Sequence, residues 1–337
     1  MLSLKDFAPQ GESVASLSRQ IAEGRLTHAL LISGESGLGK WTLARTLAAA
    51  LLCTGQEGDL LPCGKCKSCA EMAAGTHPDL IVLQKGEPLV PTDTKTVIPV
   101  SDVQEMIRRV SLRGFQGNRR VVVIRQAEDL NIPAQNKMLK TLEEPPEGVY
   151  FFLTCTQSDR LLPTIVSRCR PVKLHPWSEA DLLRILEEKG VPKEKAAIAA
   201  REAEGSVGKA VSVSQDEQYW AFRGEVIQDI LGCTKRSGIY QVSARWKERK
   251  DDAENLFNVL SHVFSRMTRF ALAVDQSPRE DPDWPEVWAR FARQAQTEDL
   301  IRCSGAVNLA RKRLQNNVQF QTVLEQLILS LMEASHQ

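Results

Sequence analysis

The chain has no excess of charge of either sign. Its 337 residues carry 43 Lys and Arg against 42 Asp and Glu, a formal net charge of +1. This balance excludes a global attraction to nucleic acid, so that any DNA contact has to come from a local patch. Internal repeats and low-complexity tracts are also missing. The length is sufficient for two or three domains with substantial cores.

Long hydrophobic runs are missing as well. The best candidate, Trp41–Cys53, is too short to span a bilayer and is interrupted by Arg45. Met1–Phe7 lacks the apolar core of a signal peptide. We therefore expect a cytoplasmic protein without a membrane partner. In that compartment the eight cysteines are not expected to form disulfides, so their clustering is more informative than their number.

The first chemical pattern is Gly34–Lys40, which reads G-E-S-G-L-G-K. In the motif G-x-x-x-x-G-K-[ST], backbone N–H groups cradle phosphates, Lys reaches the terminal phosphates and the hydroxyl holds Mg²⁺. Here Trp41 stands where Ser or Thr belongs, and Thr42 points about 100° further round the helix. The candidate nucleotide-binding residues therefore form a degenerate set: Gly34, Gly37, Gly39, Lys40 and Thr42.

Short apolar runs on either side of this loop predict a sheet: Thr27–Ser33, Leu80–Leu83, Val121–Ile124 and Val149–Leu153. Continuous rather than alternating runs are typical of parallel strands that helices cover on both faces. The helices predicted between them are Lys40–Leu52, Asp102–Val110 with Ser101 as its cap, and Ala134–Glu143. We therefore predict a doubly wound α/β domain over residues 1–176.

After Pro176 the strand signals stop. Ser178 and Asp181 have the spacing of a capping box ahead of a helix at Glu179–Lys189. We predict a small helical domain over residues 177–215 and an all-α C-terminal domain over residues 216–337. The C-terminal domain is expected to contain a proline-rich loop at Gln276–Pro285 and one last amphipathic helix at about Val307–Glu333.

Four cysteines form the second chemical pattern. Cys63, Cys66 and Cys69 are each separated by two residues, and Cys53 precedes them across nine intervening residues. Four thiolates give Zn²⁺ a closed tetrahedral shell with no position for water, so the predicted site is structural. Buried or redox cysteines are the alternative, and His77 is an alternative ligand to Cys53. The scattered cysteines are predicted to be packed thiols: Cys155, Cys169, Cys233 and Cys303.

Two further segments connect these patterns to a family. Asn136–Pro146 reads N-K-M-L-K-T-L-E-E-P-P, and Ser167-Arg168-Cys169 follows. Together with the phosphate loop and the C-x-x-C-x-x-C insertion, these segments resemble the bacterial clamp loaders. Those proteins are AAA+ subunits of DNA polymerase III that place the sliding clamp on primed DNA. The resemblance covers residues 1 to about 210, and beyond them it rests on a helical tail that includes Asn317-Val318-Gln319.

The resemblance implies an AAA+ domain with a zinc insertion over about 53–69, a helical lid domain and a helical collar that joins the subunits. It also implies gamma/tau and delta subunits as partners, with the clamp and primer–template DNA reached through the complex. Two kinds of member are relevant: the gamma/tau motor, which hydrolyses ATP, and the delta prime subunit beside it, which typically does not. Polymerisation belongs to another subunit of the holoenzyme.

Three positions that serve hydrolysis in the motor are changed in this chain. Trp41 replaces the metal-binding hydroxyl, and Arg125-Gln126 replaces the Asp-Glu pair that holds Mg²⁺ and orients the attacking water. Gly208 stands where the motor has its sensor-2 arginine, with Lys209 as an imperfect substitute. Thr154 or Thr156 corresponds to the sensor-1 residue, or serves as a core hydrogen-bonding group.

Arg168 is the retained position. It matches the arginine finger that clamp-loader subunits insert into a neighbour's ATP site; the alternative is a surface ion-pair residue. Loss of a subunit's own chemistry with the finger kept is the delta prime pattern. The alternatives for the whole chain are an active gamma/tau-type ATPase and a scaffold with permanently bound ATP or ADP. With no metal site, Lys40 either binds phosphate or packs against and caps the loop.

A cluster of arginines is the last candidate site. It lies between Glu105 and Glu128, with no acidic residue among its members. Such a patch suits the phosphates of DNA, and it equally suits a solvated face or a subunit contact. The candidate DNA contacts are Arg108, Arg109, Arg113, Arg119 and Arg120, with Arg125 at the end of the cluster.

Overall fold

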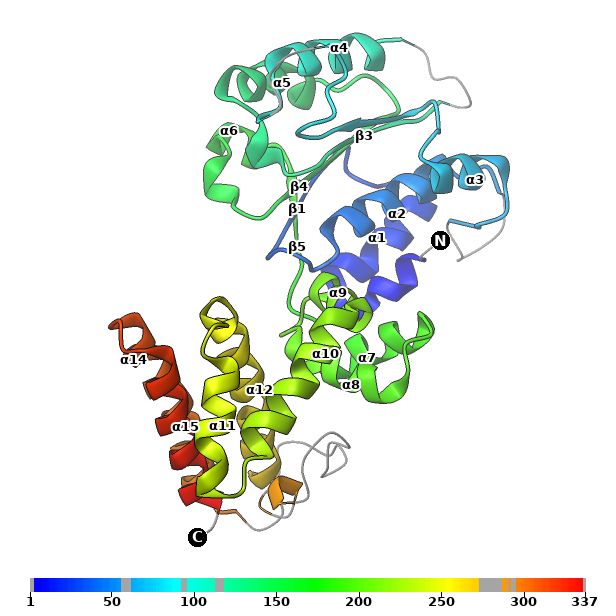
Figure 1. The fold of residues 1–337 in the computed structure, drawn as a ribbon. Coiled ribbons are helices and arrows are strands. Elements are labelled where there is room, and N and C mark those ends of the chain that lie inside the picture. Colours follow the sequence, from blue (N-terminus) through cyan, green and yellow to red (C-terminus); the bar gives the residue numbers. More distant parts are fainter. Residues whose placement is uncertain are drawn as a thin grey trace. The chain divides into compact units, whose positions relative to one another are not determined.

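The computed structural model describes residues 3–55, 62–91, 96–112, 118–272, 287–289, 291 and 295–335. The chain forms two compact units, Met1–Ser214 and Gln215–Gln337 (Figure 1). The first unit contains the phosphate loop, the cysteine cluster and Arg168. The predicted finer boundary at residue 176, between an α/β domain and a lid, stays a prediction.

A parallel five-stranded sheet in the order β2-β3-β4-β1-β5 forms the centre of the first unit (Figure 1). Its strands are β1 (Ala29–Ser33), β2 (Leu80–Leu83), β3 (Arg120–Ile124), β4 (Val149–Cys155) and β5 (Arg170–Lys173). In the register of the sheet, Ile32 lies beside Thr154 on one side and Val172 on the other. Because parallel strands end at the same edge, the segments that follow β1, β3 and β4 meet there.

Helices cover both faces of this sheet. Their bounds are α1 (Glu12–Ala22), α2 (Lys40–Leu52), α3 (Lys67–Ala74), α4 (Val100–Val110), α5 (Ile132–Glu143), α6 (Pro163–Val166), α7 (Glu179–Glu188), α8 (Lys193–Glu202) and α9 (Val207–Gln215), preceded by the 3₁₀ helix η1 (Leu4–Gln10). Ile32 of β1 lies in the core shared with α1, α2 and α7–α9, whereas Leu31 lies in the core shared with α4 and α5. The predicted doubly wound α/β fold is confirmed.

Local sequence signals set several of these helix ends. The Ser178 side chain accepts a hydrogen bond from the Asp181 N–H (3.1 Å) at the start of α7, as predicted. The Asn131 side chain does the same for Ala134 (2.9 Å) at the start of α5. The predicted cap of α4 is wrong by two residues, because Pro99 rather than Ser101 precedes the helix.

The second unit is helical throughout the part that the structure describes. Its α-helices include α10 (Glu217–Val226), α11 (Arg236–Trp246), α12 (Ala253–Ala271), α14 (Thr297–Gln315) and α15 (Phe320–Ser335). They pack around a common core in which Trp246, Phe257 and Phe264 are fully buried. The predicted proline-rich loop, Gln276–Pro285, lies outside the described residues. Within the described ranges, no helix combines the length and hydrophobicity that a membrane span requires.

Two elements differ from the sequence-based expectations. β5 was not predicted, since Arg170–Lys173 is an edge strand that contains Pro171 and little apolar sequence. The last predicted helix is instead two helices, α14 and α15, separated at Asn316–Gln319. Asn317 adopts a left-handed conformation (φ 59°) there, which Asn tolerates better than most residues.

Candidate functional sites

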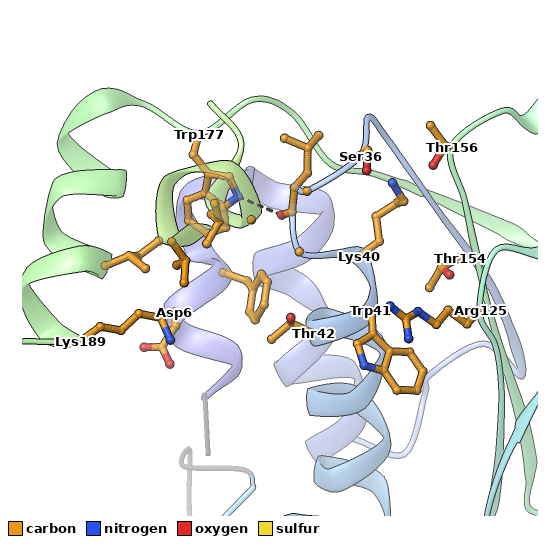
Figure 2. Close-up of a pocket in the computed structure, with 18 of the residues that line it drawn as sticks. Asp6, Ser36, Lys40, Trp41, Thr42, Arg125, Thr154, Thr156, Trp177 and Lys189 are labelled. Atoms are coloured by element: carbon orange, nitrogen blue, oxygen red, sulfur yellow. Dashed lines mark hydrogen bonds between the residues drawn. The ribbon is translucent and has the colours of Figure 1, made fainter. Parts of the chain in front are cut away.

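The phosphate loop joins β1 to α2 at the edge where the parallel strands end. Gly39, the N-cap of α2, has φ 94° and ψ 19°, a conformation that glycine adopts without strain. A cavity of about 660 Å³ opens beside the loop (Figure 2). Its lining includes Gly37, Gly39, Lys40, Trp41 and Thr42, so most of the predicted nucleotide-binding residues face one space.

Lys40 is turned back onto its own loop. Its Nζ donates to the carbonyl oxygens of Gly34 and Glu35, each at 2.6 Å, and the residue is only 9% exposed. Burial lowers the pKa of Lys40, although the negative charge of Glu128 opposes this shift. These bonds correspond to the capping role that was one of the two predictions for Lys40. A role of Lys40 in phosphate binding stays a prediction.

Trp41 contacts two arginines. The guanidinium carbon of Arg125 lies 5.3 Å from the centre of the Trp41 ring, and that of Arg45 lies 5.9 Å from it. Figure 2 shows Arg125 beside the indole. Arg125 also donates to the Gln84 side chain (3.2 Å). Cation–π contacts therefore hold positive charge at the position where the resemblance implies Mg²⁺ in a motor subunit, and like charges disfavour a dication there.

The segment after β3 binds back to β4. The Gln126 N–H donates to Thr154 Oγ1 (3.0 Å), and Thr154 is 2% exposed. Thr154 thus forms the core hydrogen bond that was one of the two roles predicted for it. Glu128, which the sequence places beyond the strand end, accepts a hydrogen bond from the Thr156 N–H (2.8 Å). Sequence reasoning missed this proximity of Glu128 to the cavity, because it depends on the short 3₁₀ turn Ala127–Asp129.

The first turn of α9 and Trp177, just before α7, bind the phosphate loop directly. The Gly208 N–H donates to the Gly37 carbonyl (2.9 Å), and Trp177 Nε1 donates to the Leu38 carbonyl (3.0 Å, dashed in Figure 2). A Cβ atom on Gly208 would lie 3.1 Å from the Cα of Gly37. Gly208 lines the cavity and Lys209 does not, and a sensor-2 role of Lys209 stays a prediction.

We expect Gly37→Ala to lower the free energy of unfolding by about 1–2 kcal/mol more than Gly190→Ala does. Both glycines have nearly the same left-handed φ (78° and 80°), so backbone strain is matched. A Cβ atom at Gly37 would lie 2.0 Å from Ser206 Oγ, whereas nothing lies within 4 Å of one at Gly190. Chemical denaturation of both variants tests this, and equal losses would contradict the observed packing of α9 on the loop.

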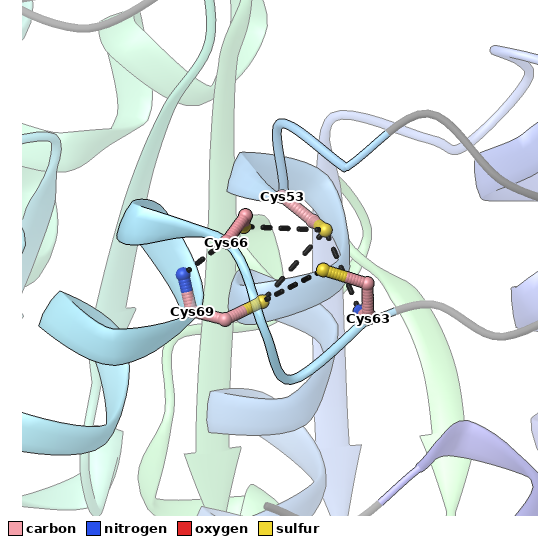
Figure 3. A group of neighbouring side chains, drawn as sticks. All are labelled: Cys53, Cys63, Cys66 and Cys69. Carbon is pink, nitrogen blue, oxygen red and sulfur yellow. Dashed lines mark hydrogen bonds between the residues drawn. The ribbon is translucent and has the colours of Figure 1, made fainter.

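The four predicted zinc ligands converge on one point (Figure 3). Cys53 follows α2, Cys66 caps α3, and Cys69 lies in its first turn. The Sγ atoms of Cys53 and Cys66 are 3.8 Å apart, those of Cys63 and Cys69 are 3.9 Å apart, and those of Cys53 and Cys69 are 3.7 Å apart. A tetrahedron with Zn–S bonds of about 2.3 Å has S···S edges of about 3.8 Å, so the cluster has the size that Zn²⁺ requires.

The surroundings affect the four thiols differently, and burial raises the pKa values of the Cys53 and Cys69 thiols. Burial opposes ionisation of Cys66, but hydrogen bonds with Cys69 and Thr54 outweigh it and lower the pKa of the thiol to about 5. His77 is not a ligand of the cluster. Its Nδ1 accepts from the Asp79 N–H (3.1 Å), so Nε2 carries the proton and donates to Ser68 Oγ (2.9 Å). The alternative of His77 in place of Cys53 is therefore wrong.

Arg168 projects from the turn between α6 and β5. Cys169, the next residue, is 5% exposed and fixes this turn in the core. The guanidinium donates to the Thr164 carbonyl (2.8 Å) and to a carboxylate oxygen of Glu143, with 2.9 Å from Nε. About a third of the Arg168 side chain (31%) stays exposed. The structure thus shows an ion pair and an accessible guanidinium in the same residue.

The predicted DNA patch is only partly available. Arg108 and Arg109 both bind Glu105, with Nε–O distances of 2.8 and 2.7 Å, and these bonds lower the pKa of Glu105 to about 2. Arg120 is 4% exposed and pairs with the buried Asp79 (3.3 Å). The prediction that Arg120 contacts DNA is therefore wrong, because its charge is neutralised inside the fold.

The other members of the patch differ among themselves. Arg119 is exposed and donates to the Leu51 carbonyl near the C-terminal end of α2 (3.3 Å). Arg113 lies outside the described residues. Arg108, Arg109 and Arg119 remain accessible, so a DNA contact through these three side chains stays a prediction.

Comparisons with known proteins agree with these features. The sequence profile of the family described as "DNA polymerase III, delta subunit" matches residues 9–178. The DNA polymerase III subunit delta' of Bacillus subtilis (strain 168) is 27% identical over 94% of this chain and 94% of that protein. The subunit delta' of Yersinia pestis is 33% identical over 77% of each chain. The subunit tau/gamma of Haemophilus influenzae is 30% identical over 77% of this chain, but over only 37% of that protein.

Proposed function

The chain belongs to the family of DNA polymerase III delta prime subunits, and from this premise we propose that it assists ATP-dependent loading of the sliding clamp onto primed DNA without hydrolysing ATP itself. The observation that carries this proposal is the contrast between two sites. Trp41 and Arg125 stack where a motor subunit needs metal ligands, while Arg168 remains accessible. The Bacillus subtilis delta' relative matches 94% of this chain and 94% of its own length, whereas the tau/gamma relative is matched over only 37% of its own length.

The cavity beside the phosphate loop supports the loss of hydrolysis. Hydrolysis needs Mg²⁺ to neutralise charge on the phosphates and a carboxylate to orient the attacking water. Trp41 provides no ligand for a metal, and Arg125 adds positive charge beside it. Lys40 already binds two carbonyls of its own loop, so the loop keeps its shape without phosphate. We propose that any residual nucleotide binding contributes no turnover.

We expect the isolated chain to hydrolyse ATP no faster than its Lys40→Ala variant, which provides the background rate. Trp41→Thr alone should not raise this rate, because Arg125 and Gln126 still replace the metal-binding acids. Steady-state ATPase measurements on the three proteins test the expectation. Turnover like that of a motor subunit, lost in Lys40→Ala, would identify the chain as an active ATPase instead.

We further propose that Arg168 completes the ATP site of a neighbouring gamma/tau subunit. A guanidinium donated in trans stabilises the charge that develops on the transferred phosphoryl group. Arg168 suits this role because its side chain is held at a turn anchored by the buried Cys169 and is still partly exposed. An ion pair with Glu143 does not exclude it, since the guanidinium has several donors.

Zinc is proposed as a structural component of the first unit. The cluster of Cys53, Cys63, Cys66 and Cys69 has the donor set and spacing for Zn²⁺, and four thiolates leave no position for a reacting water. The metal would cross-link the end of α2 to the start of α3. Its role would therefore be to stabilise the insertion rather than to take part in chemistry.

The partners follow from the family. We propose assembly with gamma/tau and delta subunits in the cytoplasm, through the helical second unit as a collar, with residues 177–215 acting as a lid domain. The clamp and primer–template DNA would be reached through the complex. Reconstitution with gamma/tau and delta tests the function: clamp loading and ATP turnover should both require this chain, and a complex equally active without it would refute the proposal.

A further inference from the structure

Glu143 provides the carboxylate that holds Arg168. It is the last residue of α5, and its Oε1 accepts hydrogen bonds from both Nε (2.9 Å) and one terminal nitrogen of the guanidinium. The other terminal nitrogen donates to the Thr164 carbonyl (2.8 Å). Glu143 thus holds one edge of the guanidinium and Thr164 binds it from another side. These two contacts together fix the orientation of its plane.

This arrangement leaves part of the guanidinium available. An arginine side chain has five N–H bonds, and the recorded hydrogen bonds use three of them. The two others belong to the two terminal nitrogens, one on each. Together with the 31% exposure of the side chain, this means that Arg168 can bind a phosphate oxygen while it keeps its contacts with Glu143 and Thr164.

The groups that hold Arg168 are themselves fixed. Gln135 of α5 is 1% exposed, and its side-chain oxygen accepts from the Leu162 N–H just before α6 (2.8 Å). This bond ties the helix that carries Glu143 to the helix that carries Thr164. Ser167 Oγ donates to the same Thr164 carbonyl (3.2 Å). The position of the guanidinium is therefore determined by the packing of α5 and α6.

Helix stability does not explain an acidic residue at this position. The C-terminal end of a helix carries partial negative charge, so a carboxylate there is unfavourable and a basic side chain is preferred. Glu143 is nevertheless the last residue of α5, and its recorded hydrogen bonds are those with Arg168. The Glu143 carboxylate therefore serves to bind Arg168.

We propose that Glu143 is a positioning residue for the arginine finger: it orients the Arg168 guanidinium before a neighbouring ATP site forms around it. This inference rests on the proposed role of Arg168. A long exposed side chain loses conformational entropy when it is fixed. Because Glu143 already fixes Arg168 in the isolated subunit, this entropy is not lost when the transition state forms. The preoriented guanidinium then stabilises charge without rearrangement.

The test uses the reconstituted complex with gamma/tau and delta subunits. We expect Glu143→Ala to lower kcat for ATP about tenfold at the neighbouring site that Arg168 completes, as resolved by single-turnover measurements, with KM for ATP at that site unchanged, because the finger acts on the transition state. Glu143→Gln should retain most of the activity, since its amide oxygen can still accept from Arg168. The matched control is Glu144→Ala, which removes the adjacent exposed carboxylate, for which no bond to Arg168 is recorded.

A double variant separates this inference from the finger assignment. In the Arg168→Ala background, Glu143→Ala should have no additional effect, since the two residues act as one unit. If Arg168→Ala lowers kcat and Glu143→Ala does not, the positioning role is overturned and the finger stands. Faster turnover in Glu143→Ala, a raised KM, or an equal loss in Glu144→Ala would also overturn it. If Arg168→Ala itself has no effect, both the finger and the positioning role fall.

Discussion

Replacement of Arg168 by alanine is expected to slow ATP hydrolysis at the neighbouring site that it completes by about 10³-fold or more, which is the contribution of arginine fingers donated in trans. Assembly should be preserved, because the guanidinium is partly exposed and the turn is anchored by the buried Cys169 rather than by Arg168. Hydrolysis at the other ATP sites of the complex should continue. The variant complex should therefore lack one kinetic class of ATP sites, namely the class that Arg168 completes.

Single-turnover measurements on the reconstituted complex resolve this class. Arg160→Ala is a suitable control, since Arg160 is an exposed arginine in the 3₁₀ turn Ser158–Arg160 of the same loop region. Arg168→Lys should not restore the rate, because an ammonium group cannot reproduce the planar set of donors that binds Glu143 and phosphate together. Unchanged kinetics in Arg168→Ala, with normal assembly, would refute the finger assignment.

Removal of zinc is expected to have the largest effect on stability. Binding of Zn²⁺ by four thiolates contributes on the order of 10 kcal/mol in small zinc domains. The eight residues of α3 are too few to form a stable helix by themselves. Cys66→Ser should therefore abolish zinc binding, lower the melting temperature by several degrees or more, and expose the insertion to proteases.

Metal analysis of the purified wild-type chain should give about one zinc ion per chain, as one closed four-thiolate shell requires. Cys233→Ser is the matched control, since Cys233 is partly exposed, belongs to the second unit and is not a member of the cluster. It should retain the metal and the melting temperature of the wild type. A metal-free wild-type protein that melts at the same temperature as Cys66→Ser would exclude a structural zinc site.

The sequence was sufficient for the sheet and the metal cluster because both depend on local patterns. Strands buried on both faces are largely apolar, and continuous apolar runs make up most of β1–β4. The cysteine spacing places two thiols at the start of one short helix and a third in the segment before it. β5 was missed because Arg170–Lys173 at the sheet edge is mostly polar. The break at Asn317 was missed because apolar residues continue at helical spacing on both sides of it.

The charged side chains were less predictable, because their roles depend on residues distant in the sequence. Arg120 belongs to a cluster that appears exposed in the sequence, but Asp79 lies beside it across two neighbouring strands. Glu143 precedes Arg168 by 25 residues, and only the packing of α5 against α6 brings them together. Spacing along the chain contains no signal for such pairs.

The contact between Gly208 and Gly37 limits how a phosphate-sensing arginine could be engineered into this subunit. A side chain at position 208 would place its Cβ 3.1 Å from the Cα of Gly37, so the two backbones would have to separate by a few tenths of an ångström. A side chain at position 208 therefore disturbs the hydrogen bond between the Gly208 N–H and the Gly37 carbonyl. An arginine installed at this position would require the phosphate loop to be reshaped at the same time, so that a single substitution would not be sufficient to rebuild a phosphate sensor.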